Sequence, residues 1–276
     1  RPFSSTFVPV AIGLMILGCT PIAPSSGAPQ TGNEASTATT TLNVSAAASL
    51  TEAFSEIGAD FAAAHPGADV VFNFAGSNQL AAQIGAGAPV DVFASANNAQ
   101  MNIAVETGRI ISGTQQTFAR NRLVVITPSD NPAGLSTLQD LAQPGVKIVF
   151  AASEVPVGQY TLDFLDKAAA EDALGAGYKE AVIANVVSYE ADVRAVLTKV
   201  SLGEADAGIV YKSDVGAAAD EVVQIEIPDH LNTIATYPIA ALHDSPHLEP
   251  AQQFVDFVLG PQGQQVLADY GFVAAQ

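Results

Sequence analysis

Two serine hydroxyls stand where short apolar segments give way to helix-like segments. Ser49 follows the apolar residues 42–46, and Ser77 follows the apolar residues 70–74. The first turn of a helix has backbone N–H groups without partners and the positive end of the helix dipole, so it can hold an anion. Simple helix capping would explain one such serine equally well. Two of them in consecutive strand–helix units indicate a shared anion site, because adjacent parallel strands end at one crevice.

Two later helix starts offer backbone N–H groups of the same kind. Val157 follows Pro156, and Val193 follows residues 189–192 at the start of another amphipathic segment. Tyr211 ends the apolar run 207–211, where its ring would simply pack against the second half of the chain if it had no ligand role. Spacing alone leaves capping and packing open as alternatives at these positions.

Motifs of common enzymes are absent from the sequence. It contains no G-x-S-x-G, no G-x-x-x-x-G-K-S/T and no G-x-G-x-x-G. Pro246 lies between His243 and His247 and disfavours a helix there, so a solvated loop is expected in place of a metal site. We expect no catalytic residue, no cofactor and no direct protein ligand to a metal. Solvating charges on helix surfaces are expected at Asp140, Asp163, Asp166 and Glu171.

Composition narrows the classes of partner. The 276 residues include 10 basic and 28 acidic side chains, a formal net charge of -18. Nucleic acids and anionic membrane surfaces bind proteins through clustered Lys and Arg side chains, and an acidic chain repels them, so both are disfavoured as partners. The chain is 49% hydrophobic and 14% charged, which excludes a disordered protein. The single cysteine excludes an intrachain disulfide.

The N-terminal residues resemble a lipoprotein leader. Phe7–Leu17 is an apolar run of 11 residues, too short for a membrane span of about 20. It ends in Ile-Leu-Gly-Cys at residues 16–19, similar to a bacterial lipobox, so we expect a signal over 1–19 and a lipid on Cys19. A plain secretory signal is the alternative. Residues 20–41 are rich in Thr, Ser, Ala, Pro and Gly and predict a flexible tether.

The rest of the chain alternates between strand-like and helix-like segments. The order over residues 42–96 is β-α-β-α-β, which predicts parallel pairing in a doubly wound α/β fold. Ser49–Glu52 matches the S-x-x-E capping box before the first helix, and helices are also expected after Gly76, Gly158 and Asp192. Two more are expected over 251–259 and 261–270. The expected strands are 42–46, 70–74, 91–96, 123–127, 147–150, 186–187, 207–211, 222–227 and 234–242.

Eight short motifs occur in order over residues 42–273. They are AAASLT at 46–51, FAGSNQL at 74–80, GAPVDVFASA at 87–96, VPVGQY at 155–160, DVR at 192–194, GIVY at 208–211, GPQ at 260–262 and YGF at 270–272. Each is weak alone, and together they resemble the periplasmic molybdate-binding proteins, the substrate receptors of ABC importers. The resemblance implies a type II periplasmic-binding fold, with two α/β lobes joined by two crossing segments and the anion clamped between them.

The resemblance also implies a ligand set and boundaries. The oxyanion would bind two serine hydroxyls, two backbone amides and a tyrosine hydroxyl, here Ser49, Ser77, Val157, Val193 and Tyr211. Lobe I would comprise 42–121 and 235–276, lobe II 122–234, and the crossings near 120–123 and 233–237 would act as the hinge. Val157 stands where a smaller residue is common. Gly76 stands where a serine is frequent, which removes a possible auxiliary donor.

The five ligand positions include no Lys or Arg. Hydroxyl and amide donors at helix starts can hold a dianion without a counter-charge, whereas a protonated oxyanion would bring an O–H that meets no acceptor. Arg194 is the nearest cation in sequence, and we expect its side chain to point to solvent and not to act as a counter-ion.

These observations predict a monomeric, lipid-anchored extracytoplasmic receptor for molybdate, with tungstate as co-ligand. It would lie in the periplasm or on the outer face of the cytoplasmic membrane and deliver the anion to an ABC permease. The alternatives are a receptor for another oxyanion such as sulfate and a surface lipoprotein without a transport role. An enzyme on the same scaffold would need a nucleophile–base pair or a metal cluster, and neither is found.

Overall fold

The computed structural model describes residues 39–275, which fall into one compact unit and contain two β-sheets. The first sheet has the strand order β11-β4-β10-β3-β1-β2. Its strands are β1 (Thr40–Ala47), β2 (Ala68–Ala75), β3 (Val92–Ala94), β4 (Gln116–Asn121), β10 (Ala235–Ala241) and β11 (Val273–Ala274). Strand β1 runs parallel to β2 and β3, whereas β10 is antiparallel to β3 and β4.

The second sheet has the strand order β7-β6-β8-β5-β9. Its strands are β5 (Leu123–Pro128), β6 (Ile148–Ala151), β7 (Val186–Glu190), β8 (Ala207–Tyr211) and β9 (Val222–Glu226). Strand β6 is parallel to β7 and β8, and β5 is antiparallel to β8 and β9. Both sheets are therefore mixed, because β10 and β11 run against the other strands of the first sheet and β5 runs against the other strands of the second.

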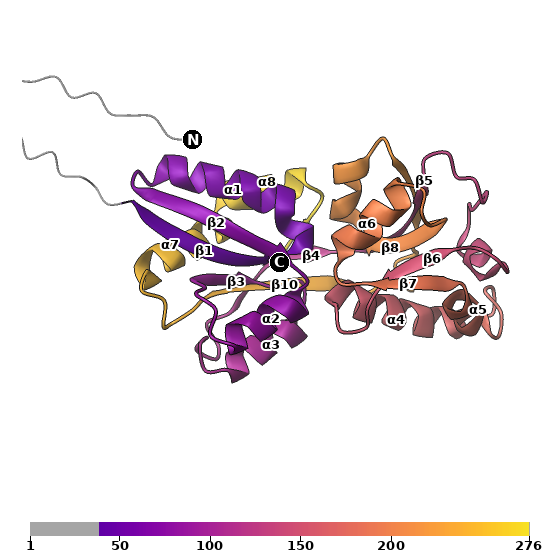
Figure 1. Ribbon diagram of the computed structural model, residues 1–276, viewed down its shortest axis with the longest axis horizontal. Coiled ribbons are helices and arrows are strands. Elements are labelled where there is room, and N and C mark those ends of the chain that lie inside the picture. Colours follow the sequence, from indigo (N-terminus) through magenta and orange to yellow (C-terminus); the bar gives the residue numbers. More distant parts are fainter. Residues whose placement is uncertain (1–38, 276) are drawn as a thin grey trace, which may run out of the picture. The chain divides into compact units, whose positions relative to one another are not determined.

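Helices cover both faces of each sheet (Figure 1). On the first sheet lie α1 (Thr51–Ala64), α2 (Ser77–Gly85), α3 (Asn98–Glu106), α7 (Leu248–Leu259) and α8 (Pro261–Asp269). On the second lie α4 (Pro156–Ala169), α5 (Tyr178–Ala184) and α6 (Val193–Ser201). Strand β3 shows why both faces must be covered, since Val92 and Ala94 join one buried cluster while Phe93 between them joins another. We call the first sheet with its helices lobe I and the second sheet with its helices lobe II.

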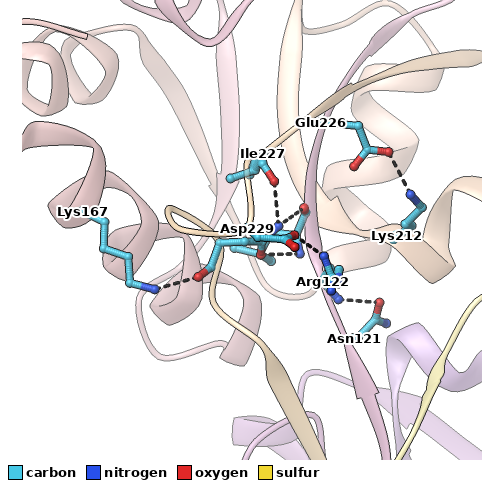
Figure 2. A network of polar contacts seen from close by, with 9 residues as sticks. Asn121, Arg122, Lys167, Lys212, Glu226, Ile227 and Asp229 are labelled. Atoms are coloured by element: carbon cyan, nitrogen blue, oxygen red, sulfur yellow. Dashed lines mark hydrogen bonds and ion pairs between the residues drawn. The ribbon is translucent and has the colours of Figure 1, made fainter. Parts of the chain in front are cut away.

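Two chain segments connect the lobes, and they lie side by side. One is the junction of β4 and β5 around Arg122, and the other leads from β9 into β10. The Asn232 side chain ties them together, because it accepts from Leu123 N at 3.1 Å and donates to Leu123 O at 2.9 Å. Figure 2 shows Arg122 paired with Asp229 beside this contact. The sequence prediction of an α/β fold with two lobes and two crossings is confirmed.

Several elements differ from the sequence prediction. Strand β4, helices α3 and α5 and the short β11 were not predicted, and β1 begins at Thr40, inside the expected tether. In β4 the sequence QTFARN is mostly polar, although Phe118 and Ala119 are buried. Helix α3 has a weakly amphipathic sequence that buries only Met101 and Ala104. Such segments become regular through tertiary packing, which local patterns do not report.

The predicted leader with Cys19 and the tether up to residue 38 lie outside the described residues. Within residues 39–275, no helix combines the length and the apolar character that a membrane crossing requires.

Candidate oxyanion site between the lobes

A small cavity lies between the two lobes and is lined by all five residues that the sequence singled out. Together with the open solvent at its mouth, its empty volume is about 210 Å³. Lobe I lines it with Ala47, Ala48, Ser49, Ala75, Gly76, Ser77 and Ala96. Lobe II lines it with Val155, Pro156, Val157, Asp192, Val193 and Tyr211. Most of these residues lie where a strand ends and a helix begins, so the wall is built mainly from strand ends and helix starts.

Ser49 does not cap a helix, contrary to the sequence prediction. The chain first makes a short 3-10 turn, Ala48–Leu50, and α1 begins after it with Leu50 at the N-cap. The expected capping box does not form, because Ser49 lies inside this turn. Its hydroxyl instead lies 3.0 Å from the Tyr237 hydroxyl on β10, and both groups are buried. The phenol can therefore fix the position of the Ser49 oxygen at the cavity wall.

Ser77 is likewise not the capping residue that was predicted. It is the first residue of α2, with Gly76 at the N-cap, and no side chain caps this helix. The Ser77 oxygen accepts a hydrogen bond from the Ala96 backbone N–H at 3.0 Å. Because this N–H occupies one lone pair of the oxygen, the Ser77 O–H stays available to donate into the cavity.

Lobe II contributes the starts of two helices. Val157 is the second residue of α4, directly after Pro156, and Val193 is the first residue of α6. N–H groups at these positions have no carbonyl partner within their own helix.

Two neighbouring residues fix the positions of these helix starts. Gly158 lets α4 approach the end of β6, since a Cβ there would lie 2.0 Å from the Ala152 carbonyl oxygen. The Asp192 carboxylate caps α6 by accepting from Ala195 N at 2.9 Å.

Tyr211 supplies a hydroxyl without a partner at the cavity. Its side chain is 1% exposed, and its hydroxyl oxygen is buried with no hydrogen-bond partner. Burial raises the pKa of the Tyr211 phenol well above its usual value, and the neighbouring Tyr237 and Asp214 act in the same direction. The phenol therefore keeps its proton at neutral pH. An unpaired buried donor costs free energy unless a ligand accepts from it, and here it borders a space in which a ligand can lie.

Residues 42–273 match the family model of bacterial extracellular solute-binding proteins. The chain belongs to this family. The resemblance deduced from the sequence motifs is thus confirmed. A molybdate-binding protein, ModA, of Mycobacterium tuberculosis is 39% identical to this solute-binding protein over 229 residues, which are 83% of each chain.

Solved structures show the same fold as this solute-binding protein. The periplasmic molybdate-binding protein of Azotobacter vinelandii superposes with a TM-score of 0.72, at 23% identity, over 85% of this chain and all (100%) of that one. The sulfate-binding protein SubI of Mycobacterium tuberculosis gives a TM-score of 0.75, at 18% identity, over 86% of this chain and 88% of that one. Receptors named for two different oxyanions thus share this fold, so the fold alone does not identify the anion.

Arg194 does not point to solvent, contrary to the sequence prediction. Its side chain is 20% exposed, pairs with Glu52 of lobe I and donates from Nε to the Ala48 carbonyl oxygen at 3.2 Å. It is not among the residues that line the cavity, and within residues 39–275 the lining includes no Lys, Arg or His. Among the described residues, the potential hydrogen-bond donors of the cavity wall are therefore neutral, and its one charged side chain is the Asp192 carboxylate.

Asp214 is a buried carboxyl behind the cavity wall that the sequence analysis missed. It is fully buried, and its Oδ2 accepts from the Tyr211 backbone N–H at 3.0 Å. Burial raises the Asp214 pKa to about 7, although the nearby Arg194 guanidinium lowers it. The short 3-10 segment Lys212–Ala218, in which Asp214 lies, thereby fixes the end of β8 that carries Tyr211.

Proposed function

We propose that this solute-binding protein binds molybdate, with tungstate as co-ligand, and delivers it to the permease of an ABC importer. The observation that carries the proposal is the lining of one cavity by five donor positions picked from the sequence alone, one of them the unpartnered Tyr211 hydroxyl. The name of the 39% identical relative supports the choice of molybdate.

In this proposal the tetrahedral anion accepts hydrogen bonds from both lobes. Ser49 and Ser77 donate from lobe I, and Val157 N–H, Val193 N–H and the Tyr211 hydroxyl donate from lobe II. The Ala96 N–H donates to the Ser77 oxygen, which leaves the Ser77 proton for the ligand. Either hydroxyl of the Ser49–Tyr237 pair can donate to the other, and in this proposal Tyr237 donates, so that the Ser49 proton turns to the ligand. The helix dipoles of α4 and α6 add positive potential at their first turns.

Neutral donors alone would also make the site selective for a fully deprotonated oxyanion. Four acceptor oxygens can satisfy the five donors, because an oxygen accepts more than one hydrogen bond. An oxyanion that keeps a proton brings a donor, and Asp192, the one carboxylate that lines the cavity within residues 39–275, is already engaged in capping α6. Such an anion would lose one hydrogen bond and leave its O–H unpaired.

The finer organisation is part of the same proposal. Lobe I would comprise 42–121 and 235–276 and lobe II 122–234, with the two crossings as the hinge. A lipid on Cys19 would anchor a monomer outside the cytoplasm, with residues 20–41 largely serving as a tether, and no cofactor would be required. Membership of an extracellular family supports the location.

Calorimetric titration of the full chain with molybdate, tungstate, sulfate and phosphate tests the choice of anion. We expect molybdate and tungstate to bind and sulfate to bind far more weakly. Because a ligand stabilises the folded state by RT ln(1 + [L]/Kd), molybdate at a thousandfold excess over Kd adds about 4 kcal/mol and raises Tm by several degrees. Equal shifts with molybdate and sulfate would contradict the claim of selectivity, and a Tm that no anion changes would favour a lipoprotein without a transport role.

The Tyr211→Phe variant tests the lobe II half of the site. It removes one hydrogen bond to a charged group, worth roughly 1.5–3 kcal/mol, which corresponds to a 10- to 150-fold rise in Kd. Tyr178→Phe is the matched control, because Tyr178 is also a buried tyrosine of lobe II but donates to the Leu138 carbonyl oxygen at 2.7 Å. The control should lose stability and keep its affinity, whereas Tyr211→Phe should do the reverse. Unchanged molybdate binding by Tyr211→Phe would remove Tyr211 from the site.

A further inference from the structure

The Arg194 side chain crosses from lobe II to lobe I beside the cavity. From the first turn of α6 it reaches the Glu52 carboxylate on α1 and the carbonyl oxygen of Ala48. The other ion pairs found within residues 39–275 each join residues of the same lobe. Arg194–Glu52 is therefore the ion pair of the described region that depends on how the lobes sit against each other.

The two ends of this contact lie next to cavity donors. Arg194 follows Val193 directly, and Ala48 precedes Ser49. The hydrogen bond of 3.2 Å from Arg194 Nε to Ala48 O therefore draws the start of α6 towards the turn that carries the Ser49 hydroxyl. The guanidinium itself stays outside the cavity lining, so it acts on the walls and not on the anion.

Asp214 gives the guanidinium a partner within lobe II. Its Oδ1 lies 3.4 Å from Arg194 Nε, and the carboxyl is fully buried. If the lobes separate, Arg194 retains Asp214 but loses Glu52 and Ala48 O. A contact that exists only when the lobes are closed stabilises the closed state alone, and it shifts the population towards that state.

We propose that Arg194 is a latch, a positioning residue that holds the lobes closed over the bound oxyanion through Glu52 and Ala48 and thereby slows release. This inference rests on the proposed function of the cavity. A latch made on closure acts mainly on the rate at which the complex opens. The dissociation rate constant koff should therefore change, whereas the association rate constant kon, which depends on the open protein, should change little.

The test compares molybdate binding by the full-chain parent, Arg194→Ala and Glu52→Gln, with Kd from calorimetry and koff from stopped-flow mixing. Arg109→Ala is the matched control, because the Arg109 side chain is as buried as that of Arg194, 19% against 20% exposed. Its ion pair with Asp244, at 2.8 Å, lies within lobe I and does not join the lobes. We expect Arg194→Ala to raise Kd and koff by about 5- to 30-fold and Glu52→Gln by about 3- to 10-fold. The double variant should bind no more weakly than Arg194→Ala alone, because both substitutions break one contact. Arg109→Ala should leave Kd within twofold of the parent.

Three results would overturn the latch. One is a Kd within twofold of the parent for Arg194→Ala. Another is an effect confined to kon, which would mean that Arg194 attracts the anion electrostatically. The third is an equal loss of affinity in Arg109→Ala, which would assign the effect to general destabilisation. The parent titration separates the latch from the proposed function: if another oxyanion binds in place of molybdate, the variants are compared with that anion, and a parent that binds none overturns both.

Discussion

Replacing Gly76 with alanine should weaken anion binding without damaging the fold. Gly76 precedes Ser77 in the cavity wall, and its φ of -58° suits any residue. A Cβ at this position would lie 2.7 Å from the Ala191 carbonyl oxygen of lobe II and 2.7 Å from Asn78 Oδ1. The Asn78 side chain can turn away, but the Ala191 oxygen is backbone next to the cavity residue Asp192. The lobes of Gly76→Ala must therefore stop short of full closure.

The magnitude follows from the cost of one extra methyl group in a packed contact. Overpacking costs about 1–3 kcal/mol, which here falls on the closed state and corresponds to a 5- to 150-fold rise in Kd for molybdate. Glycine thus does more here than omit a hydroxyl donor, because it allows the two lobes to approach.

Calorimetry of Gly76→Ala and Gly85→Ala checks this reasoning. Gly85 ends the same helix, α2, and a Cβ there would make an ordinary contact of 3.5 Å with Thr107 Cγ2. We expect Gly85→Ala to bind like the parent, and we expect both variants to keep nearly the same Tm without ligand. A Kd within twofold of the parent for Gly76→Ala would refute the argument, since it would mean that binding does not require the closeness seen at Ala191.

Two further substitutions probe groups behind the cavity wall. Tyr237→Phe removes the hydroxyl 3.0 Å from Ser49 Oγ, so the serine loses its fixed orientation, and titration should show Kd raised about 3- to 10-fold; unchanged affinity would show that Ser49 needs no such support. Asp214→Asn tests the carboxyl whose pKa is raised to about 7 from 3.8 in the folded protein. Because the folded protein holds the Asp214 proton more tightly than the unfolded chain does, this carboxyl stabilises the fold below pH 4, and that stability is lost as the pH rises to about 7. The variant has no such proton, so the free energy of unfolding of the parent minus that of the variant should fall by about 4 kcal/mol between pH 4 and 8. Urea unfolding at both pH values measures this difference, and a pH-independent difference would contradict it.

The regular elements with strong apolar patterns were predictable, because burial and local pattern agree in them. Strand β8 is fully buried and reads AGIVY, and α6 buries Val193, Val196, Leu197 and Val200 at helical spacing. Strand β4 was missed because its sequence is mostly polar, and its last residue, Asn121, is buried at the lobe crossing, where it donates to the Ser213 hydroxyl at 2.8 Å. That interaction is set by the tertiary structure, and no local sequence window contains both partners.

For the site, the sequence indicated which backbone and hydroxyl groups meet but not what holds them. The serines were expected to be caps, whereas Ser49 instead contacts Tyr237, which is 188 residues away in the chain. Arg194 was expected in solvent, yet its partner Glu52 lies 142 residues away. An arginine beside a helix start carries no sign of such a distant carboxylate. The Ser49–Tyr237 contact depends on the return of β10 to the first sheet, and the Arg194–Glu52 contact depends on the closed arrangement of the lobes. Motif order alone specifies neither.

The discontinuity of lobe I has a consequence for how the chain acquires its structure. Strand β3 pairs with β10, for example Ala94 with Ile239, so the middle of the first sheet is complete only after this late part of the chain has joined it. Lobe II, from β5 to β9, is continuous in the sequence, and its most distant strand pairing, Val124 with Glu226, joins residues closer in the chain than Ala94 and Ile239. Contacts over such long separations form slowly, because the chain entropy lost in closing the loop comes before the packing gained. A chain delivered from its N-terminus, during synthesis or export, therefore keeps β1–β3 without their β10 partner until nearly all of it has emerged. The anion site, with donors from both lobes, is correspondingly among the last features to form.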